Sequence, residues 1–254
     1  MIDLFTILSL LLVMGIGIVL GIILQWIRVP SSIRRYISSA LFFSKRQFDH
    51  PRKKLVKLEV RGSGHGEDAL SPHTEEDGHY IFQTLELPVS KIALILIDVW
   101  AEHPVSGWLE RANKNISMKL LPLVQIAREH GVMVIHSPHN RAINSLLTPL
   151  PNEPVIDSFA SKNRLLKTLK RSGVEHLIYA GYSSNMCVLT RQTGVIEMAQ
   201  NGYKIIFVRD ASLAIEAPEF LEGELTHKVV TYMVETNWGV TTEVNQIFES
   251  FQTV

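Results

Sequence analysis

The only cysteine of the chain, Cys187, stands where an apolar run gives way to a helical pattern. Residues 177–180 (LIYA) are typical of a buried strand, and the helical pattern begins at the cysteine and continues to about residue 202. Unpaired N–H groups and the helix dipole stabilise an anion at a helix N-terminus, so this position predicts a lowered thiol pKa. The pattern indicates a nucleophile, and the alternative is a buried cysteine that acts as a small hydrophobe.

Two acidic residues follow other apolar runs. Asp98 ends the run 92–97, and Asp210 follows the run 204–208. Because the carboxyl ends of parallel strands meet at one edge of a sheet, we expect both near Cys187. A carboxylate beside a cysteine can take the thiol proton and later return it to a leaving group. For Asp98 the alternative is a helix cap or turn, and for Asp210 we expect a structural hydrogen bond.

The elements that must position these residues alternate along the chain. Apolar runs predict strands, and amphipathic patterns that end at glycines predict helices between them. This alternation favours an α/β fold with a parallel sheet covered by helices on both faces. A loop at 137–160 is too long to be idle in a compact domain. The expected strands are 92–97, 132–136, 177–180 and 204–208, the expected helices are 112–129, 162–171, 187–202 and 218–235, and a short strand or helix is expected at 241–251.

The amino-terminal part has a different composition. Residues 4–27 carry no charge, which predicts one retained transmembrane helix, and the basic flank after it predicts that the rest of the chain faces the cytoplasm. Membrane lipid, and as an open alternative a membrane protein, would then be partners. We expect an anchor at 1–30, a basic juxtamembrane segment with a polar linker or hairpin at 31–90, and a globular domain at 91–254.

Composition excludes several classes of function. The 254 residues have a net charge of zero, so nothing points to a nucleic-acid partner. A single cysteine excludes an internal disulfide framework and a cysteine-rich metal site. His65, His73 and His79 have no ligand spacing, and we expect neither a metal nor a cofactor.

Three segments resemble the isochorismatase-like cysteine hydrolase superfamily, which includes nicotinamidases, carbamoylsarcosine amidases and ureidoacrylate hydrolases. They are IALILID followed by an aromatic residue, VIHSPHN, and LIYAGYSSNMCVLTRQTGVIEMAQNGYKIIFVRDAS. The resemblance covers about residues 91–250. It implies a three-layer α/β/α sandwich with a parallel sheet of about six strands, here preceded by the transmembrane helix.

The resemblance also implies a mechanism. Cys187 would attack an amide or carbamoyl carbonyl of a small molecule, and Asp98 would accept the thiol proton and protonate the leaving amine. Backbone N–H groups of Ser183 and Cys187 would hold the oxyanion, and a cis peptide bond is expected at Tyr182–Ser183. Self-association is a further expectation.

One departure from the family pattern concerns the third catalytic residue. The family has a lysine just before the segment that matches Phe159, but no lysine occurs here between Lys119 and Lys162. Without a cation, a thiolate and a carboxylate repel and the thiol pKa rises. Either Lys162 or Arg141 takes the place of the lysine, or the domain is a degenerate hydrolase that serves as a membrane-tethered binding or assembly module.

The substrate pocket is expected around the loops that follow the strands. Aromatic and histidine side chains in them suit a planar substrate, although core packing is the alternative for the aromatic residues. A metal near His136 and His139 is a weaker alternative, since the family's Asp-x-His pattern is missing. Vinyl-ether cleavage is less favoured because the relatives that perform it lack the cysteine. The expected pocket residues are Trp100, His103, Trp108, His136, His139 and Tyr182.

Overall fold

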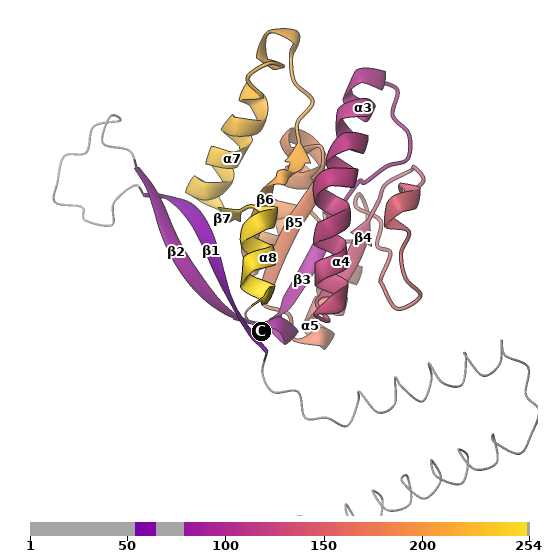
Figure 1. The fold of residues 1–254 in the computed structure, drawn as a ribbon. Helices are drawn as coiled ribbons and strands as arrows, with labels where there is room; N and C mark the ends of the chain where they lie inside the picture. Colours follow the sequence, from indigo (N-terminus) through magenta and orange to yellow (C-terminus); the bar gives the residue numbers. More distant parts are fainter. Residues whose placement is uncertain (1–53, 65–78, 253–254) are drawn as a thin grey trace, which may run out of the picture. The chain divides into compact units, whose positions relative to one another are not determined.

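A computed structural model of the chain describes residues 54–64 and 79–252, and in this part of the chain seven strands form one sheet (Figure 1). The strand order is β2-β1-β7-β6-β5-β3-β4. The five strands from β3 to β7 run parallel, and β1 runs antiparallel to both of its neighbours. The strands are β1 (Leu55–Gly64), β2 (His79–Pro88), β3 (Ile92–Ile97), β4 (Met133–Ser137), β5 (His176–Tyr182), β6 (Lys204–Leu213) and β7 (Gly239–Thr242).

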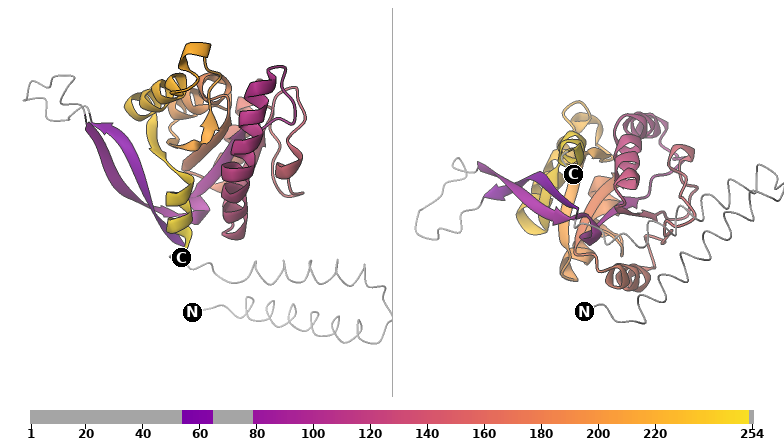
Figure 2. Two further views of the ribbon diagram at one scale, coloured as in Figure 1. Left: turned by 45° about the horizontal axis from the view of Figure 1, so that its top comes forward. Right: turned by 60° about the horizontal axis from the view of Figure 1, so that its bottom comes forward.

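Helices cover both faces of the sheet and make a three-layer α/β/α sandwich, as predicted. Figure 2 shows the same layers from two other directions. The α-helices are α3 (Ser106–Asn115), α4 (Leu121–Glu129), α5 (Lys162–Ser172), α6 (Val195–Gln200), α7 (Leu225–Asn237) and α8 (Val244–Gln252). Short helical segments are η2 (Val89–Lys91), η3 (Ile116–Leu120), η4 (Ser145–Leu147), η5 (Ser184–Val188) and η6 (Pro218–Phe220).

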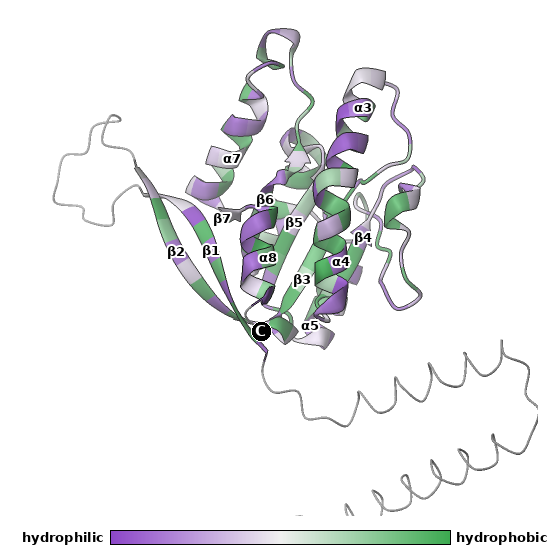
Figure 3. Cartoon of the chain, viewed as in Figure 1, coloured by the Kyte–Doolittle hydropathy of each residue, from purple (hydrophilic) through white to green (hydrophobic). Residues whose placement is uncertain are grey.

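Alternate residues of the central strands enter two separate hydrophobic cores. Leu94 and Leu96 pack with α3, α4 and α8, whereas Ile95 and Ile97 pack with α5, α6 and α7. This follows from the two-residue repeat of a strand, and burial on both faces explains why β3 is apolar throughout. Figure 3 shows apolar residues concentrated along β3, β4 and β5.

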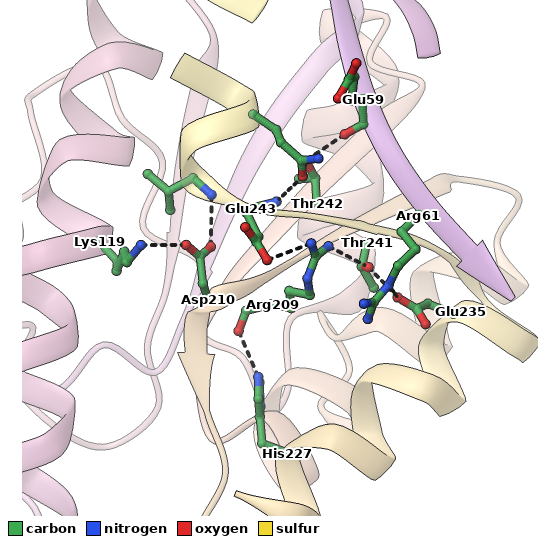
Figure 4. Close-up of polar contacts among 12 residues, drawn as sticks. Glu59, Arg61, Lys119, Arg209, Asp210, His227, Glu235, Thr241, Thr242 and Glu243 are labelled. Atoms are coloured by element: carbon green, nitrogen blue, oxygen red, sulfur yellow. Dashed lines mark hydrogen bonds and ion pairs between the residues drawn. The ribbon is translucent and has the colours of Figure 1, made fainter. Parts of the chain in front are cut away.

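The hairpin foreseen as an option before residue 90 forms, and it adds two antiparallel strands to the sheet. β1 and β2 pair from Leu55 and Pro88 through to Gly64 and His79. Val56, Leu58 and Val60 of β1 pack into the hydrophobic core. Polar contacts add to this attachment: Arg61 Nε of β1 lies 2.8 Å from Glu235 Oε1 of α7, and the Thr241 hydroxyl of β7 donates to the same oxygen (Figure 4). The sheet is therefore mixed, and not purely parallel as predicted.

Two predicted helices have different limits in the structure. The helical stretch expected at 112–129 begins six residues earlier, at Ser106. The helix expected at 187–202 is broken: it begins at Ser184, bends at residues 191–194, and resumes as α6. Gly194 lies at this bend, where a Cβ atom would come within 2.7 Å of the carbonyl oxygen of Val188. The close approach of the chain to itself ends the first helical segment.

The predicted single-pass membrane localisation is not supported and has to be corrected. Within residues 54–64 and 79–252, no helix is both long enough and apolar enough to cross a membrane. The apolar segment 4–27 and its basic flank lie outside the described residues.

Candidate functional site

The ends of two neighbouring strands bring Asp98 and Cys187 together. Ile97, the last residue of β3, pairs with Gly181 of β5, so the segments that follow both strands leave the sheet side by side. Gly181 has a φ of +117°, and a Cβ atom there would lie 2.2 Å from the carbonyl oxygen of Ile97. Only glycine allows β3 and β5 to approach this closely, and the approach places the carboxylate next to the thiol.

Asp98 is fully buried, and two other segments contact its carboxylate while a third binds its backbone N–H. Its backbone has a φ of +46°, a region that aspartate tolerates better than most residues, and its N–H donates to the Ser137 carbonyl oxygen at 3.1 Å. Oδ1 accepts a hydrogen bond of 3.1 Å from the Ser158 hydroxyl. Oδ2 lies 3.7 Å from Arg191 Nε in an ion pair. One oxygen is thus fixed by the loop 137–160, and the other faces the helical segment of the cysteine.

Cys187 lies in η5, a π-helical turn that two side chains tie to the rest of the domain. The expected cis peptide bond, Tyr182–Ser183, precedes this turn. The Ser184 hydroxyl pairs with His227 Nδ1 of α7 at 2.9 Å, and the Asn185 side chain exchanges two 3.2 Å hydrogen bonds with the backbone of Ile215. These contacts fix the turn that carries the thiol, so its orientation does not depend on a long helix.

The predicted lowering of the thiol pKa is wrong. Burial raises the pKa of Cys187, the Asp98 carboxylate raises it further, and Arg191 opposes both through its charge and a hydrogen bond. Burial also raises the pKa of Asp98. Four other interactions lower it: the hydrogen bond of the thiol, the charge of Arg191, the hydrogen bond of Ser158 and the charge of His139. Burial thus raises the pKa of both groups, and the thiol and the carboxylate are close enough to hydrogen-bond, as general-base activation of a thiol requires.

Arg191 is the site residue that the sequence analysis missed. It lies one helical turn after the cysteine, and its backbone N–H donates to the Cys187 carbonyl oxygen at 3.2 Å. A signal was present, because residues four apart share one face of a helix and the helical pattern began at Cys187.

The two cations considered for the missing lysine are engaged elsewhere. Lys162 Nζ lies 2.9 Å from Glu197 Oε1 of α6. The guanidinium of Arg141 lies over the Trp100 ring, 5.3 Å from its centroid. The structure therefore pairs neither with Asp98, and this corrects the assignment of Lys162 as a catalytic candidate.

The predicted pocket residues separate into two groups. Trp108 and Tyr182 are buried in the core on the α3–α4 face, and the Tyr182 hydroxyl donates to Asn115 Oδ1 at 2.8 Å. These two side chains contribute to the packing of the fold, and His103 connects them to the second group, because its ring centroid lies 4.3 Å from that of Trp108. Trp100 packs against the core of Cys187, and His103 stacks on its ring with centroids 5.7 Å apart.

The two histidines after β4 also differ. His136 is buried, and its Nε2 lies 2.9 Å from Glu153 Oε2, which makes it part of the support of the loop and not of the pocket. His139 pairs with Asp157 at 3.0 Å and stacks on Phe159. Among the described residues, no group of three or more histidine, cysteine, aspartate or glutamate side chains is arranged to hold a metal ion. His65 and His73 lie outside those residues.

Asp210 has the structural hydrogen bonds expected of it. Its Oδ1 accepts from the backbone N–H of Val244 at 2.9 Å, and its Oδ2 pairs with Lys119 Nζ at 2.8 Å (Figure 4). The carboxylate thus joins β6, η3 and the start of α8. Participation of the Ser183 and Cys187 N–H groups in an oxyanion hole stays a prediction.

Comparison with solved structures finds the same fold in bacterial proteins. A cysteine hydrolase from Pseudomonas syringae pv. phaseolicola 1448A matches 66% of this chain and 95% of its own, with 17% identity and a TM-score of 0.56. An isochorismatase from Pseudomonas putida KT2440 matches 62% and 90%, with 23% identity and a TM-score of 0.50. No curated protein matches the sequence.

A family model for the isochorismatase domain matches residues 92–222. The matched range includes both strand ends that form the site, with Asp98 and Cys187, and also Arg191. It extends over more than half of the 254 residues. The chain therefore belongs to the isochorismatase family.

Proposed function

We propose that this protein hydrolyses a C–N amide or carbamoyl bond of a small molecule through a thioester on Cys187. The observation that carries the proposal is the buried pair formed by the Cys187 thiol and the Asp98 carboxylate. The carboxylate raises the pKa of the thiol, and the hydrogen bond of the thiol lowers the pKa of the carboxyl group. The family and the likeness in fold to a cysteine hydrolase support it. An isolated buried cysteine would need no carboxylate beside it.

The chemistry requires one proton to move between two residues. Asp98 takes the thiol proton as the sulfur of Cys187 attacks the carbonyl carbon, and then delivers that proton to the nitrogen as the C–N bond breaks. Water next attacks the thioester and gives its proton to Asp98, which returns it to the departing sulfur. The sum is one amide and one water converted into one acid and one amine. Ser158 keeps the carboxylate oriented through its hydrogen bond to Oδ1.

The surroundings of the pair agree with a small substrate that carries a planar group. Trp100 and Phe159 come from the two loops that follow β3 and β4, and each lies under an arginine guanidinium. Phe159 is 54% exposed, so part of its side chain stays open to solvent although His139 and Arg191 contact the ring. Which amide or carbamoyl compound is cleaved depends on these two loops.

Release of amine or ammonia from a panel of small amides and carbamoyl compounds tests the proposal, with Cys187→Ala and Cys187→Ser as the inactive variants. We expect turnover by the wild type, a loss of at least about a thousandfold in both variants, and a substrate-derived mass on the wild-type protein when the reaction is quenched in acid. Full turnover by Cys187→Ala would refute the proposal. A wild type that binds these compounds without cleaving them would favour a binding module.

A further inference from the structure

The cation beside the cysteine–carboxylate pair comes from the helical segment of the cysteine itself. Arg191 Nε lies 3.7 Å from Asp98 Oδ2 in an ion pair, both atoms are buried, and the Cys187 thiol hydrogen-bonds to both side chains. We propose that Arg191 supplies the positive charge of the catalytic centre, in the role that the resemblance assigns to a lysine before Phe159. This inference rests on the proposed function, because it assigns a role within the same site.

The position of Arg191 is determined by contacts on both sides of its backbone. Its N–H bonds to the Cys187 carbonyl oxygen, and its own carbonyl oxygen accepts from the Gly194 N–H at 2.8 Å. Thr193, fully buried, pairs with the Ser137 hydroxyl at 2.8 Å and accepts a 2.7 Å hydrogen bond from the Tyr179 hydroxyl. The chain is therefore fixed immediately after the arginine, whose Nε lies beside Asp98.

The guanidinium is held from the other side by an aromatic ring. Its central carbon lies 5.2 Å from the centroid of Phe159, within the range of a cation–π interaction. Phe159 belongs to the segment that provides Ser158 to Asp98. One short segment of the loop 137–160 thus orients both the carboxylate and its cation.

The charge of Arg191 matches the proton transfer in the proposed reaction. Before proton transfer, Asp98 is the anion and the thiol is neutral; after the proton has moved to Asp98, the carboxyl is neutral and the negative charge lies on the sulfur until it attacks the carbonyl carbon. The net charge of the three groups is zero in both states, so the buried site never carries an uncompensated anion. Arg191 lowers the pKa of both Asp98 and Cys187, which agrees with a cation that faces both groups.

Other charged groups near the pair do not fill this role. Among the groups that change the pKa of Asp98, His139 has the smallest effect, and it is paired with Asp157. Lys162 is paired with Glu197. Arg141 lies over Trp100. Among the described residues, Arg191 is the one cation in an ion pair with Asp98.

The test is the pH dependence of alkylation by iodoacetamide, and every modified thiol is Cys187 because the chain has no other cysteine. In Arg191→Gln we expect the alkylation midpoint to rise by about one to two pH units, since an opposite charge at this range shifts a pKa by about that amount. Arg191→Lys should restore part of the difference. Lys162→Gln, which also removes one cation from the same region, is the matched control and should keep the wild-type midpoint.

The inference is overturned if Arg191→Gln has the same alkylation midpoint as the wild type while its unfolding midpoint is unchanged. It is also overturned if the alkylation midpoint of Lys162→Gln rises as much as that of Arg191→Gln. The outcome is separable from that of the proposed function. Hydrolysis by the wild type together with a thiol indifferent to Arg191 would refute this inference alone. A thiol that responds to Arg191 in a protein that cleaves no amide would refute only the proposed function.

Discussion

Glu153 anchors the loop 137–160, and its replacement tests how that loop supports the site. The carboxylate accepts hydrogen bonds from Arg128 at 2.7 and 2.8 Å, pairs with His136 at 2.9 Å, and accepts from the Leu150 N–H at 2.9 Å. Burial raises the pKa of Glu153, but these partners outweigh burial and lower it from 4.5 to about 2. The side chain is only 5% exposed, so solvent screens these interactions little.

The size of the effect follows from the pKa change. A fall from 4.5 to about 2 corresponds to about 3 kcal/mol of stability at about 1.4 kcal/mol per pKa unit. Because the folded-state pKa is lowered, this stability is present above pH 4.5 and is lost as the pH falls towards 2. We expect the free energy of unfolding of Glu153→Gln to be about 2–3 kcal/mol lower than that of the wild type at pH 7, and the difference to become smaller at low pH.

Urea unfolding followed by circular dichroism at pH 7, 5 and 3.5 measures this difference. Glu175→Gln is the matched control. Glu175 forms an ion pair with Lys91 at 2.8 Å, and its side chain is 57% exposed, so solvent screens the pair. We expect this variant to have the same free energy of unfolding as the wild type. The reasoning fails if Glu153→Gln is as stable as the wild type at pH 7. It also fails if the deficit stays constant down to pH 3.5.

The remaining predictions concern the strand ends that form the site. Gly181→Ala should cost at least about 3 kcal/mol, because φ is +117° and a Cβ would lie 2.2 Å from the Ile97 carbonyl oxygen. Gly202 has a φ of +85° but no atom within 4 Å of its Cβ position, so Gly202→Ala should lose only about 1 kcal/mol of unfolding free energy. Equal losses for the two variants in urea unfolding would contradict the steric clash proposed at Gly181. Asp98→Asn should lower the alkylation midpoint of Cys187 by about one to three pH units, because it removes the carboxylate that raises the thiol pKa, and should abolish amine release. An unchanged midpoint would show that the two groups do not interact.

Much of the parallel sheet was predictable because its strands are buried on both faces. A strand such as β3 has no polar position, so a continuous apolar run identifies it without any knowledge of its neighbours. The hairpin was harder to predict, because β1 and β2 are pleated strands with one buried face. Their place beside β7 depends on contacts such as that of Arg61 with Glu235, residues far apart in the sequence.

The two reactive residues were also predictable, since parallel strands end at one edge of a sheet and both residues follow strands. The helix at Cys187 was predicted to be continuous, and its break at residues 191–194 was not foreseen, because the break depends on buried contacts of Thr193 with β4 and β5. The thiol pKa was misjudged for a related reason: burial and a carboxylate are properties of the folded site, and they outweigh the local helix terminus.

The sequence by itself determined the alternation of strands and helices between residues 92 and 208, the positions of Asp98 and Cys187 at strand ends, and the absence of a lysine where the family has one. These are local properties, because each depends on a short stretch of residues and on its period of hydrophobicity. Only the tertiary structure decided that Arg191 is the cation beside Asp98 and Cys187. It also decided that Lys162 forms an ion pair with Glu197, and that Trp108 and Tyr182 are core residues. Charge pairing and burial depend on distances between segments that no local pattern records.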